Sequence, residues 1–216
     1  MLFSLLISLI LAPSYSWDIS DYGQYNSEQF FARSDVNTSI DLNKLNRSLL
    51  DAAVFYASNE ARNRRKKETL SFNIHLQKAA IQHSDDMERE DFISHQNPRE
   101  AKSRTPMMRI ENAGGDFKAT AENIARVNLY QLGPGMEYFV DKNGRKLDSK
   151  GHPLKLHTYA SLARMVVEGW MNSKGHRENL LGDYDFLGCG VSKLTWSGQQ
   201  MPEILITQNF GTKKLP

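Results

Sequence analysis

The sequence contains only one cysteine, Cys189, among its 216 residues. A single thiol excludes an intramolecular disulfide framework, so an exported form of this chain must be stabilised by its core alone. Excess charge is also scarce, because 27 lysines and arginines are balanced by 25 acidic residues. A net charge of +2 gives no field that would predict binding to nucleic acid. Partners must therefore be inferred from local features.

The signature strings of common hydrolases are missing as well. The chain has no G-x-S-x-G string for a nucleophilic serine and no H-E-x-x-H string for a zinc protease. Cys189 lies between Gly188 and Gly190, a setting typical of a small buried strand residue, and we expect it to be unreactive. With 40% hydrophobic and 24% charged residues, the composition is that of a globular protein of one domain, at most two.

The N-terminus departs from this ordinary composition. Residues 2–12, LFSLLISLILA, form an apolar run that is followed by Ser14 and Ser16, small residues in the −3 and −1 positions of a cleavage site. This predicts a signal peptide over residues 1–16. A retained anchor or a misassigned start codon remains an alternative, because only the amino group of Met1 is positive. The run is short for a bilayer span, so we expect no transmembrane segment after its removal.

The rest of the chain divides into an arm and one domain. Residues 17–40 are mixed acidic and aromatic without periodicity, and we expect them to drape over the domain or to fray, with no core depending on them. The domain is predicted over residues 41–213. Its first helix begins near Asp41 and its apolar residues share one face: Leu42, Leu45, Leu49, Ala53, Ala57 and Ala61.

That first helix runs into RNRRKK, residues 62–67. Such a run can bind an anionic polymer or lipid headgroups. The alternative, which the sequence favours, is a solvated last turn whose cations complement the helix dipole.

Two further helices are predicted with caps at Asn73 and Thr158, and Ser173 can cap a short fourth. Their buried stripes are Leu76, Ala80, His83 and Met87, and Tyr159, Leu162, Val166 and Trp170. Because a histidine on an apolar face is more often a core residue than a ligand, we keep His83 outside the candidate site.

Two strand pairs complete the predicted elements. The Asn143-Gly144 pair within residues 139–147 predicts a β-hairpin in an insertion of about residues 138–156. Residues 186–196 and 203–211 are separated by a polar, turn-rich segment and predict an antiparallel pair. Helices followed by paired strands indicate an α+β fold.

Taken in order, several strings resemble the CAP superfamily of cysteine-rich secretory, antigen 5 and pathogenesis-related proteins, in its bacterial-type branch. The strings are LQKAAIQHSDDM and FISH within residues 76–95, AENIA at 121–125, WMNSKGHRENLL at 170–181, LGCGVS at 187–192 and ITQNFG at 206–211. The resemblance covers roughly residues 42–212. It implies a three-layer α-β-α sandwich with an antiparallel sheet and a cleft where histidines and acids meet.

The resemblance also implies the site residues. His95 matches the histidine of the bacterial FSH string, Glu122 the glutamate of the GEN string, and His176 the histidine of the GH string. Ser173 occupies the place of the family's second acid, and Ala121 replaces the glycine before the glutamate. Glu168 and Glu178 are acids near that place, but neither matches its position.

His176 is expected in the first turn of the short fourth helix, where the positive end of the dipole favours a neutral imidazole. A neutral imidazole can bind a divalent metal, and two histidines with one carboxylate form the ligand set of an open zinc site. His95 and His176 are thus candidate metal ligands, with zinc as the candidate cofactor. The alternative is a hydrogen-bonded knot in which the histidines and Glu122 hold three segments together.

Two functions follow. Because members of the family are associated with lipid or sterol binding, defence and host interaction, the first is a secreted, non-enzymatic protein that binds a lipid, an envelope component or a partner protein. The second is metal-dependent hydrolysis of an extracellular peptide or ester, with Glu122 as general base. The lack of disulfides points to a bacterial protein that is secreted or periplasmic. We also expect the hairpin insertion to border the cleft and shape access to it.

Overall fold

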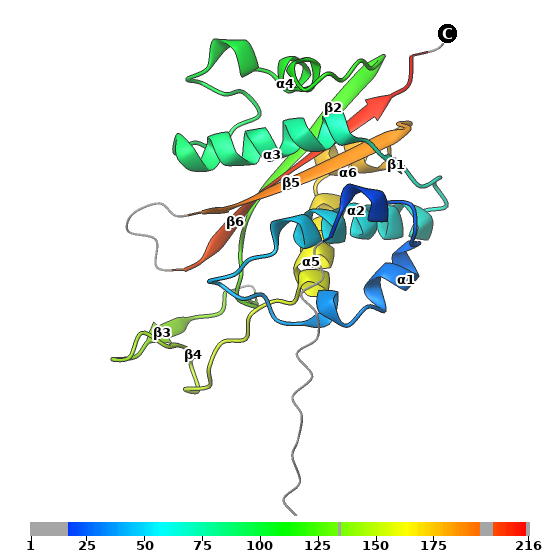
Figure 1. The fold of residues 1–216 in the computed structure, drawn as a ribbon. Coiled ribbons are helices and arrows are strands. Elements are labelled where there is room, and N and C mark those ends of the chain that lie inside the picture. Colours follow the sequence, from blue (N-terminus) through cyan, green and yellow to red (C-terminus); the bar gives the residue numbers. More distant parts are fainter. Residues whose placement is uncertain (1–16, 134, 195–200, 215–216) are drawn as a thin grey trace, which may run out of the picture.

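The computed structural model describes residues 17–133, 135–194 and 201–214 (Figure 1), so the predicted signal peptide lies outside the described residues. The helices are α1 (Ser27–Phe31), α2 (Arg47–Arg64), α3 (Ile74–Arg89), α4 (Pro106–Asn112), α5 (Tyr159–Asn172) and α6 (Lys174–Leu181). The strands are β1 (Ser71–Phe72), β2 (Ala119–Asn128), β3 (Tyr138–Val140), β4 (Lys146–Asp148), β5 (Phe186–Leu194) and β6 (Glu203–Thr212).

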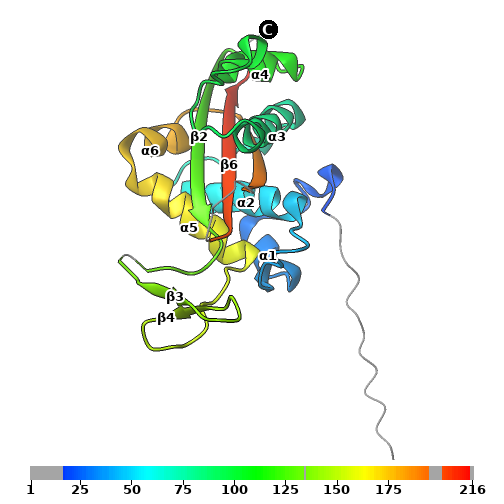
Figure 2. The same cartoon turned by 90° about the vertical axis from the view of Figure 1, so that its left-hand side faces the viewer.

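The main sheet has the strand order β1-β5-β6-β2. Strands β5, β6 and β2 pair antiparallel, whereas the short β1 is parallel to β5. Helices α3 and α4 lie on one side of this sheet, and α2, α5 and α6 lie on the other (Figures 1 and 2). The predicted α-β-α sandwich and the antiparallel pair at the end of the chain are confirmed. Strand β2 is an edge strand, and this position matters for the site.

The packing of strand β5 explains why glycines flank Cys189 in the string Gly188-Cys189-Gly190. A Cβ at Gly188 would lie 2.2 Å from the backbone nitrogen of Gln77, and one at Gly190 would lie 2.2 Å from that of Ile81. The two glycines therefore let α3 pack directly on the strand. Cys189 faces the opposite side, is 2% exposed and belongs to the main core. Its expected burial is confirmed.

The predicted helices form with small differences at their ends. Helix α3 follows its cap Asn73 and α5 follows Thr158, as the spacing predicts. Helix α2 starts later than expected, at Arg47, because Asn46 caps it by accepting a hydrogen bond from the amide of Leu49. The leucines before Asn46 pack against the core from outside the helix.

The basic run at the end of α2 is only partly solvated. Residues 63–67 are exposed, in agreement with the favoured interpretation. Arg62 is an exception, because it is 2% exposed and donates hydrogen bonds to the carbonyl oxygens of Glu68, Leu180 and Gly182. It joins α2 to the end of α6, a role that a charge pattern does not reveal.

The N-terminal arm is part of the core, so the expectation that no core depends on it is wrong. Its apolar side chains are buried together with those of α2 and α5: Trp17, Phe30, Phe31, Val36 and Ile40. Trp17 packs edge-on against Phe30 and Tyr56. Aromatic residues in an aperiodic segment carry a large buried area that periodicity does not detect.

The predicted hairpin is confirmed as a ribbon in which β3 pairs antiparallel with β4. Its loop is longer than a two-residue Asn-Gly turn: Asp141 still pairs with Arg145, and Gly144 takes the positive φ of 76°. The ribbon projects beyond the end of β2 (Figures 1 and 2), about 20 Å along the strand from Glu122. The ribbon therefore does not reach Glu122, and its expected effect on access to a cleft stays a prediction. The segments at its base adjoin a hollow at the far end of β2.

Candidate functional site

Glu122 is the centre of the candidate site. It lies near the start of β2, and its side chain is 2% exposed. One carboxylate oxygen, Oε1, is 2.9 Å from Nδ1 of His95, and the other, Oε2, accepts a 2.7 Å hydrogen bond from Arg109. Because a carboxylate beside an arginine can only accept, Nδ1 of His95 carries the proton. In the neutral form of the ring, the lone pair of His95 is therefore on Nε2.

Arg109 is the site residue that the sequence did not reveal. It lies on α4, is fully buried, and donates hydrogen bonds to the carbonyl oxygens of Ser103, Arg104 and His95 as well as to Glu122. Its guanidinium therefore ties the loop that carries His95 to the edge strand. No string in the sequence marks it, since an arginine on a short helix is usually a surface residue.

His83 also belongs to this cluster, although the sequence placed it outside the site. It is a fully buried core residue of α3, as predicted, and its Nε2 donates to the carbonyl oxygen of Ser94 at 2.9 Å. The same nitrogen is 3.8 Å from Oε1 of Glu122. Burial lowers the pKa of His83 from 6.5 to about 4; the Glu122 charge opposes this shift and Arg109 adds to it. The ring is therefore neutral at pH 7.

His176 approaches the cluster from the other side of the edge strand. The amide group of Asn123 donates to the carbonyl oxygen of His176 at 3.2 Å, and that of Asn179 donates to the carbonyl oxygen of Glu122 at 3.1 Å. Burial and the nearby His95 both lower the pKa of His176, so the expected neutral imidazole is supported. Ser173 stands at the N-cap position of α6, but its side chain makes no capping bond.

The acids considered as replacements for the family's second acid stay outside the cluster. Glu168 is exposed and lies 3.9 Å from Arg64, and Glu178 is exposed on α6. Neither therefore supplies a second carboxylate beside Glu122, whose counter-ion is Arg109.

This arrangement does not match the expected zinc ligand set. Across the residues that the structure describes, no group of three or more histidine, cysteine, aspartate or glutamate side chains is placed to hold a metal ion. Both oxygens of Glu122 are already engaged, and Arg109 holds a fixed positive charge against them. The donors left for a metal are His95 and His176. Glu122 would then orient the ring of His95 through its hydrogen bond to Nδ1.

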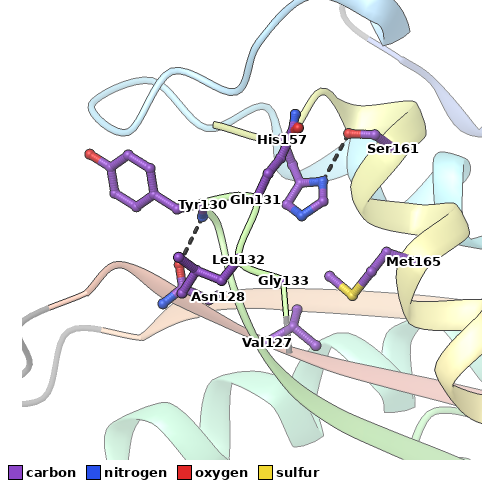
Figure 3. Close-up of a pocket in the computed structure, with 9 residues that line it drawn as sticks. All are labelled: Val127, Asn128, Tyr130, Gln131, Leu132, Gly133, His157, Ser161 and Met165. Carbon is purple, nitrogen blue, oxygen red and sulfur yellow. Dashed lines mark hydrogen bonds between the residues drawn. The ribbon is translucent and has the colours of Figure 1, made fainter. Parts of the chain in front are cut away.

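A groove runs from His176 along the edge strand, between β2 and α5. Its first hollow has a volume of about 310 Å³ and is lined by Ile124, Ala125, Arg126, Val127, Met165, Val166, Gly169, Trp170, Ser173 and His176. A second hollow of about 430 Å³ continues at the far end of β2 (Figure 3). Val127 and Met165 line both, so the two hollows are neighbours along β2, and we call them together the β2–α5 groove.

The sequence of α5 explains why the groove exists. Ser161, Met165, Gly169 and Ser173 recur every four residues and so lie along one helix face. Met165 is the only large side chain in this series, and a Cβ at Gly169 would meet no atom within 4 Å. Trp170 forms part of the wall and donates to the carbonyl oxygen of Ile124. Small residues on the helix thus leave open space beside the edge strand.

Comparison with known proteins agrees with this fold. The family model described as CAP, cysteine-rich secretory protein family, matches residues 55–210. Among curated proteins, the chain is 30% identical over 115 residues to the uncharacterized membrane protein YlbC of Bacillus subtilis. The match covers 53% of the chain but only 23% of that protein, so most of YlbC has no counterpart here.

Solved structures show the same fold. An extracellular protein containing a SCP domain, from Bacillus anthracis, matches with a TM-score of 0.53 and 23% identity, over 82% of this chain and 45% of that one. An outer surface protein from Borrelia burgdorferi matches with a TM-score of 0.51 and 20% identity, over 82% of this chain and 99% of that one.

Proposed function

Since the chain belongs to the cysteine-rich secretory protein (CAP) family, we propose that it is an extracytoplasmic, non-enzymatic protein that binds a lipid or other apolar ligand in the β2–α5 groove. One observation carries this proposal: two neighbouring hollows with predominantly apolar walls lie along β2, with Val127 and Met165 lining both. Sites for small apolar molecules are concave, mostly apolar and supplied with a few polar groups, and this groove has that character.

The polar cluster has a structural role in this proposal. Glu122 binds His95 and Arg109 at the same time, and Arg109 in turn holds the loop that carries His95. A carboxylate with both oxygens engaged beside an arginine is a poor general base, because its charge is already compensated. The knot of three segments is thus the favoured alternative, and it forms one end of the groove at His176.

Location outside the cytoplasm is part of the same proposal. The signal peptide predicted over residues 1–16 supports it, and among the described helices none has the length and apolar composition to cross a bilayer. N-terminal sequencing of the protein from culture medium or periplasm should find Trp17 as the first residue. Retention of residues 1–16 on membranes would show an anchor instead.

The experiment that tests the ligand is native mass spectrometry of protein purified from its own source, together with solvent extraction and elemental analysis. We expect an apolar molecule to co-purify and to be absent from a Gly169→Leu variant, whose side chain fills the groove. Stoichiometric zinc without a lipid, with esterase activity that Glu122→Gln abolishes, would instead establish metal-dependent hydrolysis.

A further inference from the structure

The projecting ribbon carries apolar side chains that the core does not bury. Phe139 and Val140 of β3 are 56% and 51% exposed, and Met136, just before the strand, is 45% exposed. Eight large hydrophobic residues are exposed in the described part of the chain, and these three lie within five positions of one another. Single exposed apolar residues are ordinary, but a group of them on one projecting segment (Figures 1 and 2) indicates an interaction surface.

These apolar side chains are exposed on both faces of the ribbon. Successive residues of a strand point to opposite faces, so Phe139 and Val140 lie on different sides. Across the ribbon, Phe139 pairs with Leu147 and Val140 pairs with Lys146. A protein partner seated on one face would leave the apolar side chain of the other face in water, whereas a lipid surface can surround both. The arrangement therefore favours a membrane over a protein partner.

The acids of the ribbon are engaged within its two turns. Asp141 accepts hydrogen bonds from the backbone amide of Asn143 and from both the amide and the side chain of Arg145. Asp148 accepts from the backbone amide and the imidazole of His152. The side chains of the two aspartates are only 18% and 27% exposed. Their charges are thus directed at the turns that they hold.

The cations of the ribbon are left on its outside. Residues 138–152 contain four lysines and arginines and two aspartates, so this segment has a net charge of +2 with histidine neutral. Lys142 and Lys150, one on each turn, are exposed and form no ion pair with any described residue. Free cations beside exposed apolar side chains complement an anionic lipid surface, which offers phosphates next to an apolar layer.

We propose that the ribbon docks this protein on the surface of an anionic lipid bilayer. Phe139 and Val140 enter the boundary between headgroups and acyl chains. Lys142 and Lys150 contact lipid phosphates. This inference goes beyond the proposed function, because the docking surface lies apart from the cluster at Glu122 and does not depend on the ligand of the β2–α5 groove.

The apolar half of the surface is tested by Phe139→Ser combined with Val140→Ser. Sedimentation with vesicles would compare phosphatidylglycerol, which is anionic, with phosphatidylcholine, which has no net charge. We expect the native protein to prefer the anionic vesicles and the double variant to lose about tenfold or more of that affinity. Met107→Ser combined with Met108→Ser is the matched control, because these neighbours on α4 are 39% and 38% exposed. It should bind like the native protein.

The charged half is tested by Lys142→Glu combined with Lys150→Glu. We expect the affinity for phosphatidylglycerol vesicles to fall about tenfold or more, because two attractive charges become repulsive. Arg65→Glu combined with Lys66→Glu makes the same change in net charge at the exposed end of α2 and should keep most of the affinity. Equal losses in the two charge variants would show that binding follows net charge, and the assignment to the ribbon would be wrong.

A fluorophore at position 139 reports immersion directly. Because Cys189 is buried in the core, a thiol reagent should label the thiol introduced by Phe139→Cys selectively. An environment-sensitive dye there should brighten on phosphatidylglycerol vesicles, whereas the same dye introduced through Met108→Cys should not. A dye at position 139 that stays in water while the protein binds vesicles would place the contact elsewhere and overturn the proposal.

The comparison of variants isolates the ribbon, because any contribution of residues 1–16 is common to all of them. Failure of the native protein to bind anionic vesicles would refute the proposal, and so would equal binding by the native protein and the two ribbon variants. Should a double variant fail to fold, the dye experiment decides by itself.

Discussion

The burial of His83 predicts that stability falls steeply between neutral and mildly acidic pH. Its pKa is lowered from 6.5 to about 4 in the folded protein, chiefly by burial. Between these values the unfolded chain binds a proton that the folded chain does not, so acid favours unfolding. The contribution is fully present above pH 6.5 and is lost as the pH falls toward 4. For one such group the free energy of unfolding should drop by about 2 kcal/mol between pH 7.5 and pH 5.

The assay is urea unfolding of the native protein and of His83→Gln at both pH values. Glutamine can keep the donor to the carbonyl oxygen of Ser94 but does not titrate. The pH dependence of the native protein should exceed that of the variant by about 2 kcal/mol. His157 and His176 also have lowered pKa values, and both proteins share their contributions. An equal dependence in the two proteins would refute the buried, neutral state of His83.

Three other predictions follow from close contacts. Arg109→Met should lower the free energy of unfolding in urea by about 3–5 kcal/mol, because Glu122 is left buried without its counter-ion. Adding Glu122→Gln to the same chain should recover part of this loss. Equal losses in the single and the double variant would refute the pairing. Gly190→Ala should lower the free energy of unfolding by about 3 kcal/mol, since its Cβ would lie 2.2 Å from the backbone of Ile81, and unchanged stability would contradict that contact. Cys189 should resist thiol reagents in the native state, because burial raises its pKa; rapid labelling would argue against this.

Periodic segments of this chain are predictable from sequence, and segments held by single contacts are not. Helices α3 and α5 and the pair β5–β6 follow from apolar spacing, because packing repeats along the element. Trp17 and the rest of the arm have no period, so their burial depends on a fit that exists only in the folded protein.

The candidate site shows the same division. The resemblance to a family identified Glu122 and His95, which the structure brings into contact. Arg109 was missed, because in the sequence it looks like a surface charge. His83 was kept outside the site, because it looks like an isolated core residue. Their roles depend on carbonyl oxygens in the loop of residues 94–104, whose path a sequence pattern does not give.

The central claim is that an apolar chain lies in the β2–α5 groove, and Gly169 tests it most directly. Calorimetric titration with laurate would compare Gly169→Leu with Gly169→Ala and with Gly175→Leu, a glycine of α6 that also has no atom within 4 Å of its Cβ position. The account predicts that Gly169→Leu loses binding while the two control variants keep it. Unchanged laurate affinity in a folded Gly169→Leu protein would contradict the account.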